Sequence, residues 1–233
     1  MKTTTISHVR VRSVKPTRIG GVGILLVALG ALTGCETAQR RASVHPRSTA
    51  PPPDPAAMEA AAARTSPIVG RPAPAFTLSD HSDKPFTLAD QRGRWIVLYF
   101  YPKDDTPGCT CQATEFTSLL KRFHSMNADV VGVSSDSPII HQFFRTKYDL
   151  RITLLSDPHH EVMRKYGAWV TARFGDEEIG RVIRSTFLID PAGQVAHHWP
   201  EVIPEGHAAR VKEQLEAIRA QRAANAADAA SSG

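Results

Sequence analysis

The chain has 233 residues, with 28 lysines and arginines against 23 aspartates and glutamates, and a formal net charge of +5. The five basic residues before position 35 account for this excess, so the rest of the chain is neutral overall. Nucleic-acid binding needs a concentrated cationic face, and this balance therefore argues against a nucleic-acid partner.

Residues 1–34 have the pattern of an export signal. A basic stretch precedes an apolar run at residues 22–32, which is too short to span a bilayer. The run ends at Leu32, Thr33, Gly34 and Cys35, which resembles the cleavage box of bacterial lipoproteins. The resemblance implies cleavage before Cys35 and lipid attachment to it, and several acyl chains on one residue anchor a protein stably. An ordinary secretory signal, with Cys35 incidental, is the alternative.

The composition divides the remaining chain into three parts. Residues 35–66 are expected to form a lipidated cysteine and a disordered, proline-rich tether, and residues 221–233 an alanine-rich disordered tail. Residues 67–220 are long enough for one well-buried domain. We expect this domain on the periplasmic or extracytoplasmic side of a bacterial membrane, and the sequence does not distinguish the inner membrane from the outer one.

The predicted elements of the domain alternate between strands and helices. A hairpin is expected at residues 76–88, then a buried strand at 95–101, a helix at 110–126 and a second buried strand at 128–134. Ser137 and Pro138 begin a helix whose inner side is expected to carry Ile139, Ile140, Phe143 and Phe144. A strand at 152–155, a helix at 160–166, strands at 184–189 and 194–198, and a last helix containing Val211, Leu215 and Ile218 follow. This order predicts an α/β fold with a mixed central sheet and helices on both faces.

The loop from Pro102 to Cys109 is the most informative segment. It places Cys109 after a buried strand and in the first turn of a helix, where backbone N–H groups and the helix dipole favour a thiolate. The hydroxyl of Thr106, three residues earlier, can reach the sulfur or a molecule approaching it. Prolines fix φ and hold the loop in one shape. The pattern indicates a reactive cysteine.

Pro102, Thr106 and Cys109 match the Pro-x-x-x-Thr-x-x-Cys signature of peroxiredoxins, and residues 101–113 resemble the bacterioferritin-comigratory, or Q-type, subgroup. Further similar segments occur in the family's order at residues 70–76, 130–138, 155–158, 165–167 and 184–190. The resemblance covers roughly residues 66–219. It implies a thioredoxin-like fold and a cofactor-free thiol peroxidase, a monomer or weak dimer, that reduces hydrogen peroxide or organic hydroperoxides.

The resemblance also implies roles for individual residues. Cys109 would attack the peroxide and become a sulfenic acid, Arg184 would hold the thiolate and the polarised peroxide, and Thr106 would orient the O–O bond. Pro102 would shield the sulfenate from solvent. The alternatives are a buried structural role for Cys109 and a surface ion pair for Arg184.

Resolution of the sulfenic acid is where this chain departs from its subgroup. A resolving cysteine often lies five residues after the first one, and this chain has Thr114 there. Cys111 is the internal candidate, but positions two apart on a helix lie about 200° apart, so the two sulfurs would face away from each other. Either the first turn unwinds so that Cys111 resolves, or the reductant is an outside thiol or a thioredoxin-like partner.

Two other functions use the same cysteines. A thiol–disulfide oxidoreductase could use Cys109 and Cys111, although the chain lacks a Cys-x-x-Cys motif. A carrier could bind a soft ion such as copper(I) through them, although no cluster of methionines or histidines supports this. Two histidine pairs, His159 with His160 and His197 with His198, lack the spacing of a zinc site, so no metal is expected and both pairs are expected to be solvated. The preferred peroxide and the physiological reductant are not predictable from the sequence.

Overall fold

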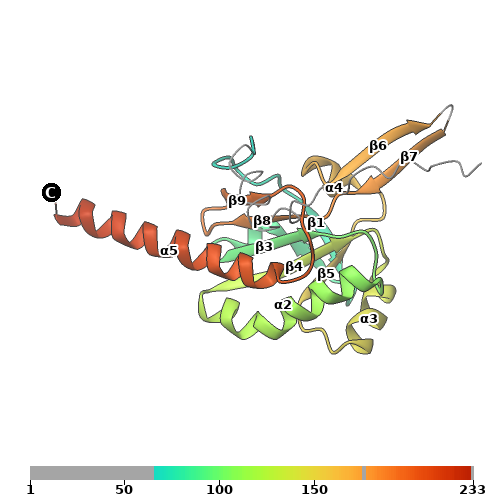
Figure 1. Ribbon diagram of the computed structural model, residues 1–233, viewed down its shortest axis with the longest axis horizontal. Helices are drawn as coiled ribbons and strands as arrows, with labels where there is room; N and C mark the ends of the chain where they lie inside the picture. Colours follow the sequence, from blue (N-terminus) through green and yellow to red (C-terminus); the bar gives the residue numbers. More distant parts are fainter. Residues whose placement is uncertain (1–65, 175–176, 232–233) are drawn as a thin grey trace, which may run out of the picture. The chain divides into compact units, whose positions relative to one another are not determined.

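The computed structural model describes residues 66–174 and 177–231, and the signal segment, Cys35 and almost all of the predicted tether lie outside them. Its centre is a seven-stranded sheet in the order β2-β1-β5-β4-β3-β8-β9 (Figure 1). The strands are β1 (Thr77–Asp80), β2 (Pro85–Thr87), β3 (Trp95–Phe100), β4 (Ala128–Ser134), β5 (Thr153–Ser156), β8 (Ser185–Ile189) and β9 (Val195–Trp199). Strands β3, β4 and β5 are parallel, and the others pair antiparallel, so the predicted mixed sheet is confirmed.

Helices cover both faces of this sheet, as predicted. They are η1 (Leu88–Gln91), α2 (Pro107–Ser125), α3 (Pro138–Lys147), α4 (Glu161–Lys165) and α5 (His207–Ser231). Alternate residues of β3 point to opposite faces, so Val97 and Tyr99 pack with α2 and α5 while Leu98 and Phe100 pack with α4. Every residue of β3 is buried, which explains why its sequence is a continuous apolar run and not an alternating one.

Helix α3 buries a different face from the predicted one. Ile139, Ile140 and Phe143 are 53%, 43% and 66% exposed, and of the four expected inward residues Phe144 alone is buried. His141 is fully buried and shares the inward face with Phe144, one turn away. The prediction failed because it ranked residues by apolar character, whereas hydrogen bonds hold His141 in the interior.

Helix α5 continues to Ser231 and thus runs through most of the segment predicted to be a disordered tail, residues 221–233. Alanine has the highest helix propensity, so an alanine-rich segment extends a helix that packing has already started. The Arg222 guanidinium also donates to Asp190 (2.9 Å) and lies over the Trp95 ring. Among the helices in the described part of the chain, none combines the length and the apolar character needed to cross a bilayer.

The sequence did not predict the hairpin of β6 (Trp169–Phe174) and β7 (Glu177–Val182), which forms a separate two-stranded sheet. A glycine is needed at position 180 of this hairpin, because a side chain there would overlap the Trp169 indole, which lies across the hairpin. The hairpin connects α4 to β8 and so precedes the strand that carries Arg184 into place.

Candidate active site

Cys109 lies where the central strand β3 gives way to helix α2. Thr106 occupies the N-cap position with extended backbone angles, and Pro107 begins the helix three residues earlier than predicted. Cys109 is therefore the third helical residue, within the turn whose N–H groups lack helical partners, and its side chain is only 1% exposed. Such a position stabilises an anion.

Arg184 reaches this cysteine through the sheet. Because β8 pairs antiparallel with β3 and Ser185 lies opposite Phe100, the residue before β8 lies beside the carboxyl end of β3. Its Nη2 is 3.3 Å from the Cys109 sulfur, and its Nη1 donates to Gln112 Oε1 at 2.7 Å. The predicted pairing of Cys109 with Arg184 is thus present in the structure.

Gln112 was not predicted to be a site residue. Gln112 is fully buried and holds one arm of the Arg184 guanidinium so that the other arm faces the sulfur. Gln112 follows Cys109 by one helical turn and therefore lies on the same face of α2. This spacing could have predicted its place in the site. Together the two bonds fix the plane of the guanidinium, which a lysine ammonium at this position would not do.

Thr106 lies half-buried at the start of α2. Its hydroxyl donates to the Lys103 carbonyl at 3.0 Å, which leaves the oxygen lone pairs as acceptors. Pro102 is exposed at the beginning of the loop, and its role as a shield for the sulfenate stays a prediction.

Two aspartates of this loop bind helix α3. Buried Asp104 accepts from the Tyr101 hydroxyl at 2.6 Å and is hydrogen-bonded to His141 Nδ1 at 2.7 Å. Exposed Asp105, in the left-handed region at φ 60°, contacts Lys147 and Tyr148 at the end of α3. These hydrogen bonds lower the pKa of the Asp105 carboxyl.

Cys111 lies in acidic surroundings that differ from those of Cys109. Its thiol donates weakly to Glu115 Oε1 at 3.7 Å, and burial together with the charges of Glu115 and Glu205 raises its pKa. The two cysteines remain thiols within one continuous helix. The structure therefore does not bring Cys111 to Cys109 as a ready resolving partner.

Residues 200–206, which connect β9 to α5, pass over the site. The Val202 N–H donates to the Arg184 carbonyl at 3.0 Å, and the Gly206 N–H donates to Glu115 Oε1 at 2.8 Å. Pro204 lies so close to Gly108 that an added Cβ there would be 3.3 Å from the proline ring and 3.5 Å from Arg184 Nη2. The connection thus restricts the approach to Cys109.

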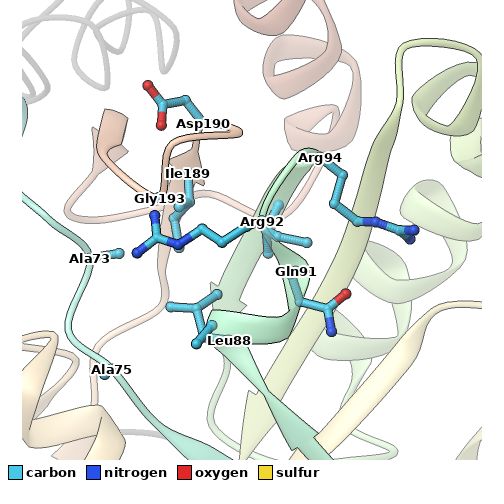
Figure 2. Close-up of a pocket in the computed structure, with 11 residues that line it drawn as sticks. Ala73, Ala75, Leu88, Gln91, Arg92, Arg94, Ile189, Asp190 and Gly193 are labelled. Carbon is cyan, nitrogen blue, oxygen red and sulfur yellow. The ribbon is translucent and has the colours of Figure 1, made fainter.

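A small cavity lies at the other end of the central strands and is not the reaction site. It has a volume of about 30 Å³ and is lined by Ile96, at the start of β3, and Ile189, at the end of β8. Figure 2 shows the Arg92 side chain extending into it beside Gly193. A cavity of this size holds little more than one water molecule. Cys109, in contrast, follows the opposite end of β3.

The prediction of solvated histidine pairs is wrong for His197 and His198. Both are half-buried in β9, and burial lowers the pKa of each to about 4. His198 stacks on Phe187 and is hydrogen-bonded to Ser66. His160 stacks on Trp169, while His159 is exposed. Within the described residues no three His, Cys, Asp or Glu side chains are grouped as they would be around a metal ion.

Known proteins resemble this chain in sequence and in fold. The model of the AhpC/TSA family matches residues 69–198. Peroxiredoxin Bcp of Bacillus subtilis is 38% identical over 148 residues, which cover 63% of this chain and 94% of that protein. The structure of the Xanthomonas campestris bacterioferritin comigratory protein has a TM-score of 0.59 at 36% identity and covers 61% of this chain and 90% of its own. The structure of peroxidoxin BcpB of Mycobacterium tuberculosis has a TM-score of 0.58 at 31% identity, and the match covers 65% of this chain and 97% of that chain.

These relatives share the fold as well as the sequence, so the predicted thioredoxin-like fold is confirmed. They also favour a peroxidase over the thiol–disulfide oxidoreductase and copper-carrier alternatives. The chain belongs to the AhpC/TSA family of peroxiredoxins, and it is a thiol peroxidase of the Bcp, or peroxiredoxin Q, subgroup.

Proposed function

We propose that Cys109 is the peroxidatic cysteine of this enzyme. The observation that carries the proposal is the 3.3 Å approach of Arg184 Nη2 to the Cys109 sulfur at the start of α2. A fixed positive charge and unpaired helix N–H groups stabilise the thiolate, which is the nucleophilic form of cysteine. The thiolate attacks the terminal peroxide oxygen, an S–O bond forms and the O–O bond breaks. Cys109 becomes a sulfenic acid, and the alkoxide or hydroxide that leaves takes a proton.

Thr106 and Arg184 hold the peroxide from two sides. Because the Thr106 hydroxyl already donates to Lys103, its oxygen accepts the hydrogen of the peroxide O–H group. The Arg184 guanidinium, held by Gln112, stabilises the negative charge that develops on the leaving oxygen. Pro102 shields the product sulfenate.

The substrates proposed are organic hydroperoxides as well as hydrogen peroxide. The Xanthomonas campestris relative was studied for alkyl peroxide reduction, and its likeness to this chain supports the extension. Comparing the rates at which the reduced protein consumes hydrogen peroxide and cumene hydroperoxide tests it. A cumene hydroperoxide rate no greater than that of the Cys109→Ser variant would refute the extension.

An outside thiol or a thioredoxin-like protein reduces the sulfenic acid. It forms a mixed disulfide with Cys109 and releases water, and a second thiol then releases Cys109 as a thiol. Two features argue against Cys111 in this role. Its thiol faces Glu115, and it lies in an intact helical turn that must unwind before the two sulfurs can meet.

The proposal is tested by trapping the first product. Reduced full-length protein is mixed with one equivalent of hydrogen peroxide and a sulfenic-acid reagent, and the adducts are mapped by mass spectrometry. An adduct on Cys109, absent in Cys109→Ser and retained in Cys111→Ser, is expected. A rapid Cys109–Cys111 disulfide would refute the outside reductant, and an unoxidised Cys109 would refute the peroxidatic role.

We also propose that lipid on Cys35 anchors the enzyme to a bacterial membrane, with the domain on the extracytoplasmic side. The support is the cleavage-box pattern of residues 32–35 after a basic, apolar leader. The full-length chain expressed in bacteria should partition into the detergent phase of Triton X-114, and the Cys35→Ser variant into the aqueous phase. Equal partition of both into water would contradict the anchor.

A further inference from the structure

His141 is a polar residue in the interior that the peroxidase chemistry described above does not use. It lies on α3, is fully buried, and has hydrogen-bond partners at both ring nitrogens. Nδ1 is 2.7 Å from Asp104 Oδ2, and Nε2 is 3.1 Å from the Leu155 carbonyl oxygen. The carbonyl is always an acceptor, so Nε2 carries a hydrogen.

The remaining gap, between Nδ1 and Asp104 Oδ2, therefore holds one proton shared by the imidazole and the carboxyl. Asp104 Oδ1 accepts from the Tyr101 hydroxyl at the same time. The imidazole and carboxyl are together neutral, with every facing lone pair or hydrogen matched, which is the condition under which a buried ionic pair is tolerated. Breaking one partner would leave the other polar group buried and unpaired.

Other charged groups lie near the pair of His141 and Asp104. The Asp104 N–H donates to Asp136 Oδ2 at 2.8 Å, and Asp136 also accepts from the Ser134 hydroxyl at the end of β4. His81, beyond β1, lies close enough to His141 for their charges to interact, and Arg145 and Asp80 act on His81 in turn. His141 thus links α3 and β5 to the loop that carries Thr106, in addition to the contacts of Asp105 with Lys147 and Tyr148.

We propose that His141 is a positioning residue of the peroxidase, which acts by fixing Asp104 and thereby the Thr106 hydroxyl at the start of α2. The hydrogen bond between His141 and Asp104 connects helix α3, which contacts no reacting atom, to the loop residue two positions before Thr106. The Arg184 guanidinium, from the residue before β8, contacts the Cys109 sulfur without using His141 or Asp104. The inference rests on the proposed roles of Cys109 and Thr106.

The test compares two amides that each retain one half of the histidine. In His141→Asn the amide nitrogen replaces Nδ1 and keeps the bond to Asp104, whereas in His141→Gln it replaces Nε2 and keeps the bond to Leu155. The second-order rate of Cys109 oxidation by peroxide should fall about tenfold in His141→Gln and less than about threefold in His141→Asn. Alkylation of Cys109 by iodoacetamide, which does not use Thr106, should stay within about twofold of wild type in both.

A double variant separates positioning from general weakening of the fold. If His141 acts through Thr106, adding His141→Gln to Thr106→Val should cost nothing further, because coupled residues are not additive. Full additivity, or a wild-type rate in His141→Gln, would overturn the inference. An equal loss in His141→Asn and His141→Gln would also overturn it.

If His141→Gln does not fold, Asp104→Asn tests the same link. Its amide nitrogen donates to Nδ1 and its oxygen accepts from Tyr101, so all three bonds persist around a neutral imidazole. The peroxide rate should then stay within about threefold of wild type, and a fall beyond tenfold in a folded protein would refute the inference. Failure of the proposed function is recognised separately, since wild-type Cys109 would then not oxidise at all.

Discussion

Arg184 Nη2 lies 3.3 Å from the sulfur of Cys109, although the two residues are 75 positions apart in the chain. The sheet brings them together, because β8 runs antiparallel to β3 and its first residue, Ser185, pairs with Phe100. Gln112 completes the arrangement from the same helix that carries the cysteine. The site therefore depends on tertiary pairing as much as on the short loop motif.

Replacing Arg184 by lysine should slow the reaction of Cys109 with peroxide by about 10²-fold, in the range found when one oxyanion donor is lost. Lysine keeps the charge but cannot bond Gln112 and face the sulfur in one plane. Stopped-flow measurement of peroxide consumption checks this. Gln112→Ala retains the Arg184 guanidinium but removes the hydrogen bond that orients it, so the peroxide rate should fall less than in Arg184→Lys. An Arg184→Lys enzyme at the wild-type rate would contradict the role of the two guanidinium bonds.

The thiol of Cys111 should react with iodoacetamide only at higher pH than an ordinary cysteine. The thiolate is the reactive form, and burial with the charges of Glu115 and Glu205 raises the pKa of this thiol, so the thiolate forms later as pH rises. Glu115→Gln removes one of these charges and should move the curve back toward lower pH. Mass spectrometry of alkylated peptides over a pH series distinguishes Cys111 from Cys109, and an unshifted Glu115→Gln curve would contradict the assignment.

The elements that carry strong local signals were predicted from the sequence. The continuous apolar run of β3 and the Pro-x-x-x-Thr-x-x-Cys loop located the strand, the start of the helix to within a turn, and Cys109, because these signals depend on neighbours in the chain. Gln112 and His141 were missed for a different reason. Both are polar side chains that are buried only because distant partners, Arg184 and Asp104, satisfy them.

Helix α5 and the hairpin β6–β7 show the same limit of prediction from sequence. Helix α5 extends beyond residue 220 where Arg222 contacts Asp190 and Trp95, and neither contact is visible in the alanine-rich composition. The hairpin β6–β7 was missed because its apolar and charged residues alternate only weakly between a short helix and β8. Tertiary contacts decided these elements.

The protein should lose stability as pH falls from about 6.5 toward 4. His197 and His198 remain neutral in the folded protein down to a pKa of about 4, whereas in the unfolded chain they protonate near 6.5. The unfolded state therefore binds more protons in this window, which favours unfolding as pH drops. Urea midpoints at several pH values check this. The His197→Gln/His198→Gln variant should show a shallower decline, and parallel declines would contradict the cause.

The contact of Asp105 with Lys147 and Tyr148 should stabilise the protein at pH values above the ordinary pKa of an aspartate. This stabilisation should be lost in acid. The hydrogen bonds from Lys147 and Tyr148 lower the pKa of the Asp105 carboxyl. The contribution of this contact to the free energy of unfolding is therefore fully present above about pH 3.9 and is lost as pH falls through the lowered pKa. Asp105→Asn should therefore reduce the urea midpoint at pH 7 and make little difference at pH 2. Because the groups are exposed, high salt should shrink the effect at pH 7, and a salt-independent difference would argue against an ionic origin.

Gly132→Ala should destabilise the domain by about 1–3 kcal/mol, the usual cost of overpacking a core. A Cβ at this position of β4 would lie 2.6 Å from the ring and hydroxyl of Tyr99, its partner in the register with β3. Tyr99 cannot move aside, since its buried ring stacks on both Tyr101 and Phe116. Urea denaturation measures the loss. In a Tyr99→Leu background the smaller side chain relieves the overlap, so the same substitution should cost less there, and an equal cost in both backgrounds would exclude the Tyr99 overlap as its cause.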